Sequence, residues 1–327
     1  MPALTPRYIR NSAILAKVEA TYGSDPTPTG AANAILVSNL SISPLESQNV
    51  PRDLVRGYFG GSEHLVGSNS VSCKFDVELV NGGTAGTVCA WGPLLVACGM
   101  AETATASYHV VYKPISTGQT GLTIWYYVDG VLHKLNGCRG TVDFKLGLNT
   151  RPVMSFSFIG LDGGVTAAAI PAQTLTAFKT PIAVTDPNTS DFTLGCTLTL
   201  GSAIPSIASG TTYPSRGIDI SLGNSLAHIP LLTGESVDIT GRETTGRVSL
   251  DLTAAQQATF HTDIKANTTT TLAMIHGTTA GYKVMVYGPA VQRINPSYEE
   301  VSGRVLTGLD LRFLPSAGND ELSIIAF

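Results

Sequence analysis

The sequence predicts a mainly β protein with a few short helices, divided into two tandem domains. The first reason is that apolar and polar side chains alternate in four separate stretches, which is the period of a strand. The second is a composition rich in glycine (34) and proline (18) with only 13% charged residues, which is typical of strands joined by turns. The third is that the second half of the chain repeats the order of elements of the first. The alternating stretches are residues 71–79, 141–146, 247–253 and 309–313.

Each alternating stretch has one apolar face, which a packed core would cover, and one polar face of mixed charge. Repetition of this pattern predicts a broad hydrophilic sheet surface. We interpret that surface as the functional surface of the protein. The alternative, for any one strand, is an ordinary solvated outer face. The residues predicted to form the polar surface are Lys74, Asp76, Glu78, Asp143, Lys145, Arg247, Asp251, Asp310 and Arg312.

The composition argues against several classes of function. With a net charge of −4, the chain has no basic field that could hold nucleic acid by releasing counterions. The low charge content indicates a surface that is largely covered in an assembly. The five cysteines form no C-x-x-C pair, which argues against zinc. A secretion signal and a run of about 18 apolar residues are both missing, so we expect folding in a reducing cytoplasm and no membrane span.

The first half begins with a predicted N-terminal arm at residues 1–34. Within it, an apolar piece at 13–19 runs into a segment rich in Pro, Gly and Thr at 21–30. Residues 34–42 are the first predicted core strand. Residues 44–67 contain several prolines and glycines, so a long exposed loop is expected there, and loops of this length are often functional.

The rest of the first half alternates turns with regular elements. Pro93 and Gly99 fit the first turn and the C-cap of a short helix within residues 90–98. Asp129-Gly130 between two apolar runs predicts a β-hairpin. Further strands are predicted at 141–147 and 153–159.

A segment with little periodicity, which contains Pro171 and Pro181, is the predicted domain boundary. Beyond it, Thr253 can cap a helix over residues 254–265. The predicted organisation is an arm (1–34), a first domain (35–165), a linker (166–185) and a second domain (186–327). Strands of the second domain are predicted at 194–200, 218–222, 247–253, 271–275, 282–287, 290–294, 305–313 and 322–327.

Five stretches of the first half carry a resemblance to a known family: residues 17–28, 33–46, 51–56, 91–95 and 129–135. In these stretches the chain resembles the major tail protein, or tail tube protein, of long-tailed, non-contractile bacteriophages (siphoviruses). The resemblance implies a tail-tube-like β-sandwich or barrel with a flanking α-helix in each domain. It also implies assembly into stacked rings whose interior conducts DNA during ejection.

Two tandem domains of this kind resemble the duplicated members of the family, in which three chains form a pseudo-six-fold ring. The alternative is that residues 180–327 form an immunoglobulin-like decoration domain, for which a hexameric ring would be expected. The predicted helix at 254–265 argues against that alternative, because immunoglobulin sandwiches lack such an element.

The resemblance implies a structural subunit of the virion tail that is assembled in the host bacterial cytoplasm. Its expected partners are further copies of itself, the tape-measure protein, the tail terminator and baseplate or distal tail proteins. DNA is expected to pass without binding, since a mixed or net-negative lining repels phosphate. No cofactor or metal is expected. Contacts between subunits or rings are expected in the arm, in the loop 44–67 and at the C-terminus, with Lys17, Glu19, Tyr22, Arg52, Asp53, Arg56, Tyr58 and Phe327 as candidates.

An enzyme is not predicted, because the six histidines show no H-x-x-x-H spacing and no G-x-S-x-G motif is present. A β-sandwich binding module or a virion surface protein is the alternative function. Its candidate feature is the aromatic run Trp125-Tyr126-Tyr127, which could stack on a sugar or a base. Packing of this run in the core is the preferred interpretation.

Overall fold

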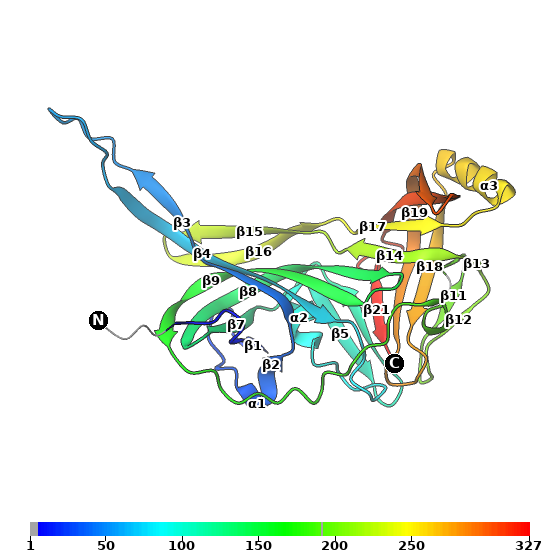
Figure 1. The fold of residues 1–327 in the computed structure, drawn as a ribbon, viewed down its shortest axis with the longest axis horizontal. Coiled ribbons are helices and arrows are strands. Elements are labelled where there is room, and N and C mark those ends of the chain that lie inside the picture. Colours follow the sequence, from blue (N-terminus) through cyan, green and yellow to red (C-terminus); the bar gives the residue numbers. More distant parts are fainter. Residues whose placement is uncertain (1–5, 191) are drawn as a thin grey trace.

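A computed structural model describes residues 6–190 and 192–327, which fold into a mainly β structure with short helices (Figure 1). The predicted mainly β class with a few short helices is therefore confirmed. The first half contains β1 (Ser12–Val18), α1 (Gly30–Asn33), β2 (Ala34–Ile35), β3 (Ser38–Pro51), β4 (His64–Glu78), α2 (Gly92–Ala97), β5 (Met100–Thr105), β6 (His109–Pro114), β7 (Leu122–Val128), β8 (Val131–Gly147) and β9 (Val153–Ala167).

The second half begins with a 3-10 turn, η1 (Asp186–Asn188). Its other elements are β10 (Phe192–Leu194), β11 (Thr197–Thr199), β12 (Ser206–Ala208), β13 (Thr211–Tyr213), β14 (Ser215–Ser221), β15 (Asn224–Leu231), β16 (Gly234–Arg242), β17 (Thr245–Leu250), α3 (Ala254–Lys265), β18 (Thr269–His276), β19 (Val284–Val301), β20 (Arg304–Leu314) and β21 (Ser323–Ala326).

Eight strands form one continuous antiparallel sheet that runs through both halves of the chain. Their order is β3-β4-β9-β8-β14-β17-β20-β19. The halves meet where β8 pairs with β14, with Phe144 opposite Ile220 and Lys145 opposite Asp219. The same strand order occurs twice, because β14, β17, β20 and β19 follow one another as β3, β4, β9 and β8 do.

The alternation in the sequence gives this sheet one packed face and one polar face. One packed row crosses the junction between the halves without a break. It consists of Val77, Met154, Phe144 and Ile220, which lie opposite one another in turn and are all buried. Burial of each such side chain stabilises the fold by about 1.5–3 kcal/mol.

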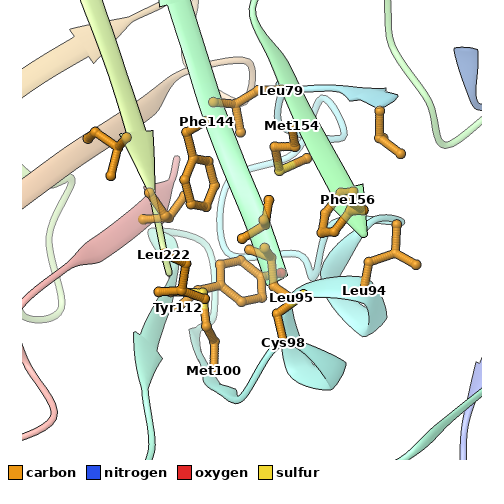
Figure 2. Close-up of a cluster of buried hydrophobic side chains, with 14 of the residues drawn as sticks. Leu79, Leu94, Leu95, Cys98, Met100, Tyr112, Phe144, Met154, Phe156 and Leu222 are labelled. Carbon is orange, nitrogen blue, oxygen red and sulfur yellow. The ribbon is translucent and has the colours of Figure 1, made fainter. Parts of the chain in front are cut away.

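Helix α2 covers the packed face of the first half, where Figure 2 shows Phe144, Met154 and Phe156 gathered around Leu94 and Leu95. The predicted signals for this helix are confirmed. Its sequence has Pro in the first turn, and Gly99 follows its end with a φ of +73°.

Two other local signals also gave the correct structure. Asp129 and Gly130 have φ values of +38° and +85°, as a tight two-residue hairpin turn between β7 and β8 requires. Thr253 caps α3 in a capping box, in which its side chain accepts a hydrogen bond from the Gln256 N–H and its own N–H donates to the Gln256 side chain.

The prediction of a loop over residues 44–67 was wrong, because β3 and β4 extend far into it and leave only 52–63 outside the strands. The two strands form a hairpin that projects from the body of the molecule (Figure 1). Pro44 and Gly67 suggested a loop, but both lie at shifts in the β3–β4 register. Such bulges leave a residue unpaired, and so they accommodate Pro and Gly within a strand.

Part of the predicted arm belongs to the body of the protein. Residues 12–18 form β1, which pairs with β2 and β7, and Ile14 and Leu15 are both fully buried. The apolar run at 13–16 is buried on both faces of its strand, so it lacks the alternation that marks the other strands.

In the second half, the predicted break at Gly288-Pro289 does not occur, because β19 runs through both residues. Pro289 is accommodated where β18 shifts its register between Thr270 and Leu272. The predicted strand 194–200 is instead split into β10 and β11, since Gly195 has a φ of +72°. No helix or strand is assigned between residues 168 and 185, which run between the halves as an extended segment.

Candidate functional site

The polar face of the eight-stranded sheet extends through both halves of the chain. One row of residues crosses all eight strands on this face, one residue from each strand, and every member is polar. In strand order from β3 to β19 the row is Ser38, Asp76, Ser155, Asp143, Ser221, Thr245, Arg312 and Gln292.

The structure brings the predicted surface residues together on this polar face. Lys74, Asp76 and Glu78 alternate with the buried side chains of β4, and Asp143 and Lys145 do the same in β8. In the second half, Arg247 of β17 lies opposite Asp310 of β20, and Arg312 lies two residues beyond Asp310 on the same face. The ninth residue, Asp251, directly follows β17 and pairs with Arg304.

Carboxylates neutralise the arginines of this surface. Arg247 contacts Glu299 at 2.9 Å and Asp310 at 3.0 Å, and Arg151 contacts Glu78 at 3.4 Å. Arg312 pairs with Glu243 in the same way. A guanidinium that already has a carboxylate partner presents a weak electrostatic field to phosphate.

One group of these contacts is centred on Glu299. Hydrogen bonds from the Ser249 hydroxyl and the Arg247 guanidinium hold the pKa of the Glu299 carboxyl below its usual value. The same contact with Glu299 raises the pKa of Arg247. Both side chains therefore remain charged and paired at neutral pH, although exposed pairs of this kind add little to stability.

Four of the predicted inter-subunit residues are occupied by contacts within the chain. Glu19 is buried and accepts hydrogen bonds from the Gly23 N–H, the Gly137 N–H and the Thr123 hydroxyl at 2.6–2.7 Å. Lys17 donates to the Pro26 carbonyl at 2.9 Å. Phe327 is buried beside β19 and β6, in the small core that β21 completes.

The fourth, Tyr22, links the two halves of the chain. Its hydroxyl accepts a hydrogen bond from the Val237 N–H at 2.6 Å and donates to the Gly137 carbonyl at 3.0 Å. The guanidinium of Arg139 lies over its ring and also pairs with Asp238. These contacts fix the β15–β16 hairpin of the second half to the first half.

The other four candidates lie at the tip of the β3–β4 hairpin, where Arg52 and Arg56 both pair with Glu63. Asp53 and Tyr58 are exposed in the same loop. Sequence reasoning missed their apolar neighbours Val55 and Phe59, whose side chains are fully exposed. Apolar residues inside a long loop were the signal that could have identified them.

Sequence reasoning also missed the two free edges of the sheet. Among the described residues, β3 pairs with β4 alone, and β19 beyond residue 292 pairs with β20 alone. The free part of β19 carries Tyr298, which is 70% exposed although it extends from the packed face of the sheet. Unpaired edges with exposed apolar side chains are sites at which another chain can add strands.

Other candidate features of the described part of the chain are metal-binding groups, the aromatic run and membrane-spanning helices. In that part of the chain, no group of three or more His, Cys, Asp or Glu side chains could hold a metal ion. The Trp125-Tyr126-Tyr127 run lies in β7, where Tyr126 and Tyr127 are buried, as expected for core packing. None of the described helices is long and apolar enough to cross a membrane.

Comparison with known families decides between the structural role and the binding module. Residues 9–311 match the family model described as phage tail tube protein. The chain belongs to the phage tail tube protein family. This membership makes it a structural subunit of the phage tail, located in the virion, and implies a role without catalysis. No curated protein matches the sequence.

Proposed function

We propose that three copies of this tail tube protein close into a ring, that the rings stack into a tube, and that the polar face of the eight-stranded sheet lines the channel. The observation that carries the proposal is that the four-strand order occurs twice, with an unbroken polar face across the β8–β14 junction.

The ring size follows from this repeat. Each half supplies four strands and occupies one of six equivalent positions around a pseudo-six-fold axis. Three chains of eight strands then close a barrel of twenty-four strands without leaving an edge. Both halves act as tail tube domains in this arrangement. A decoration domain in the second half would not continue the same sheet in the same strand order.

The lining suits the passage of DNA. Its arginines are paired with carboxylates, and Lys145 lies opposite Asp219. A lining of this composition gives phosphate no cluster of free positive charge to bind, so DNA slides past it during ejection. The tape-measure protein would occupy the same channel before ejection, and the terminator and distal tail proteins would cap the two ends of the tube.

Electron microscopy of the purified protein tests this function directly. The protein is examined in negative stain over a range of concentrations, with and without added tube fragments as seeds. We expect straight tubes with a regular axial repeat and three-fold symmetry in end-on views. Six chains around each ring would overturn the stoichiometry, and monomers at every concentration with seeds present would overturn the function.

A further inference from the structure

The junction between the two halves of one chain is a complete example of the contact that a ring needs between chains. At this junction residues 143–147 of β8 pair with residues 217–221 of β14. Phe144 and Ile220 are buried side by side on the packed face. On the polar face, the Ser221 hydroxyl donates to Asp143 at 2.6 Å.

The strands on either side of this junction can be matched between the halves residue by residue. Lys74 and Glu78 of the first half correspond to Arg247 and Asp251 of the second, because each pair places a basic and an acidic residue four positions apart at the end of the second strand in its half of the sheet order, β4 or β17. The pairing registers then carry the match outward. Ser41 lies opposite Lys74 as Asp219 lies opposite Arg247, so Ile42 and Ser43 take the places of Ile220 and Ser221.

The same reasoning applies on the other side of the sheet. Asp76 connects through Ser155 to Asp143, and the matching Ser249 connects through Gly308 to Ser297. Ser297 therefore takes the place of Asp143. Tyr298 and Glu299 follow in the places of Phe144 and Lys145.

The spacing along the strands supports this match independently. In β8, the last partner of β7 is Cys138, and pairing with β14 begins at Asp143. In β19, Gln292 is the last residue that pairs with β18. The same step of five residues, as from Cys138 to Asp143, leads from Gln292 to Ser297 as the start of the free pairing segment. Four residues separate the two pairing segments in each strand, 139–142 in β8 and 293–296 in β19. The second set includes Pro296, which has no N–H to donate to a neighbouring strand. The segments that remain, 143–147 and 297–301, both reach the end of their strands.

We propose that β19 of one copy pairs antiparallel with β3 of the next copy in a fixed register, with Ser297 opposite Ser43, Tyr298 opposite Ile42 and Glu299 opposite Ser41. This proposal rests on the proposed ring. The partner is a second copy of this chain, and the junction continues both faces of the sheet from one copy into the next.

Exposed side chains on the isolated chain fit this arrangement. Tyr298 is 70% exposed, whereas Phe144 in the corresponding place is fully buried against β14. Pairing with the next copy covers Tyr298 with Ile42, which is only half-buried in the isolated chain. The free edges of β3 and β19 then gain the main-chain hydrogen bonds that they lack.

Disulfide trapping tests the register in the full-length chain. The double variant S43C/S297C is assembled, oxidised and separated on a denaturing gel without reductant. We expect disulfide-linked dimers and trimers, with the ladder ending at three chains. The native cysteines do not interfere, because all five are buried, and burial raises the pKa of Cys73 to about 12.

Two matched variants make the outcome decisive. D143C/S221C places the same pair at the internal junction and should form a bond within one chain, which shows that the geometry permits a disulfide. S43C/E299C shifts the pair by two residues and should link at least tenfold less.

Efficient linkage of S43C/E299C in place of S43C/S297C would overturn the register. Normal tubes with no linkage of S43C/S297C, while D143C/S221C links, would overturn the junction and leave the ring in place. Failure of the wild-type chain to assemble even with seeds would overturn the ring itself.

Discussion

The first prediction tests whether Glu19 stabilises the fold of the single chain or forms a contact between subunits. Its carboxylate is buried and accepts three hydrogen bonds, from the Gly23 N–H, the Gly137 N–H and the Thr123 hydroxyl. These bonds tie the Thr21–Gly23 turn to β7 and β8. If Glu19 serves the fold of the single chain, its loss should destabilise the monomer before any assembly takes place.

The expected magnitude follows from the bonds that each substitution removes. A hydrogen bond to a charged group contributes about 1.5–3 kcal/mol, and such contributions are not fully additive. E19A removes all three and leaves the buried Gly137 N–H and the partly buried Gly23 N–H without this acceptor, so we expect a loss of about 3–5 kcal/mol. E19Q keeps one oxygen but turns an amide N–H₂ toward a donor, so we expect a loss of about 1–3 kcal/mol.

Urea unfolding of the monomer measures these losses by linear extrapolation. The control is E46Q, because Glu46 is exposed and accepts one hydrogen bond from Ser72, so its change should stay within about 0.5 kcal/mol. If E19A unfolded like the wild type and yet failed to form tubes, Glu19 would be an interface residue and the reasoning would be refuted.

Three further predictions concern the core residue Phe144, the buried His276 beside the Ile182 carbonyl of the linker, and two aspartates of the polar face. F144A should lower the free energy of unfolding by about 3–5 kcal/mol in the same assay, because Phe144 is fully buried. Burial lowers the pKa of His276, so the folded state takes up its proton at lower pH than the unfolded state does. Stability should therefore be complete above about pH 6.5 and fall as the pH drops toward the lowered pKa, and H276Q should remove that part of the pH dependence. D76K/D143K should make tubes retain DNA in a salt-dependent manner in filter binding, whereas wild-type tubes retain none.

The sequence was most informative where one short stretch decides its own conformation. The alternation in 71–79 predicted both the strand and the side on which Lys74 and Asp76 lie, because period-two patterning needs no tertiary information. Asp129-Gly130 and Thr253 were equally local signals. The internal order of strands was also visible, although their pairing was not.

The sequence was least informative where tertiary contacts decide the structure. Glu19 has the residue type of a surface side chain, and only the three donors that surround it explain its burial. The β8–β14 pairing joins strands that lie far apart in the chain, so no local pattern reveals its register. Pro44 and Gly67 ended a predicted strand because bulges cannot be recognised without the partner strand.

The tip of the β3–β4 hairpin leads to the last prediction. Val55 and Phe59 are fully exposed, and Tyr58 between them is 70% exposed, which is unfavourable for a chain that remains alone in water. In the proposed tube, a neighbouring copy covers this tip. Burial of the two fully exposed side chains would contribute about 1.5–3 kcal/mol each, or about 3–6 kcal/mol together.

V55S/F59S should therefore raise the critical concentration for tube growth by roughly two to four orders of magnitude, since about 1.4 kcal/mol corresponds to a factor of ten. Unfolding of the monomer should change by less than about 0.5 kcal/mol, because neither side chain packs within the chain. The matched control is I204S, which removes an exposed apolar side chain from the turn between β11 and β12 and should leave growth unchanged. Sedimentation of assembled tubes at graded concentrations measures each variant. Tubes of V55S/F59S that form at the wild-type concentration would show that the tip stays in solvent, and its apolar residues would then need another partner in the tail.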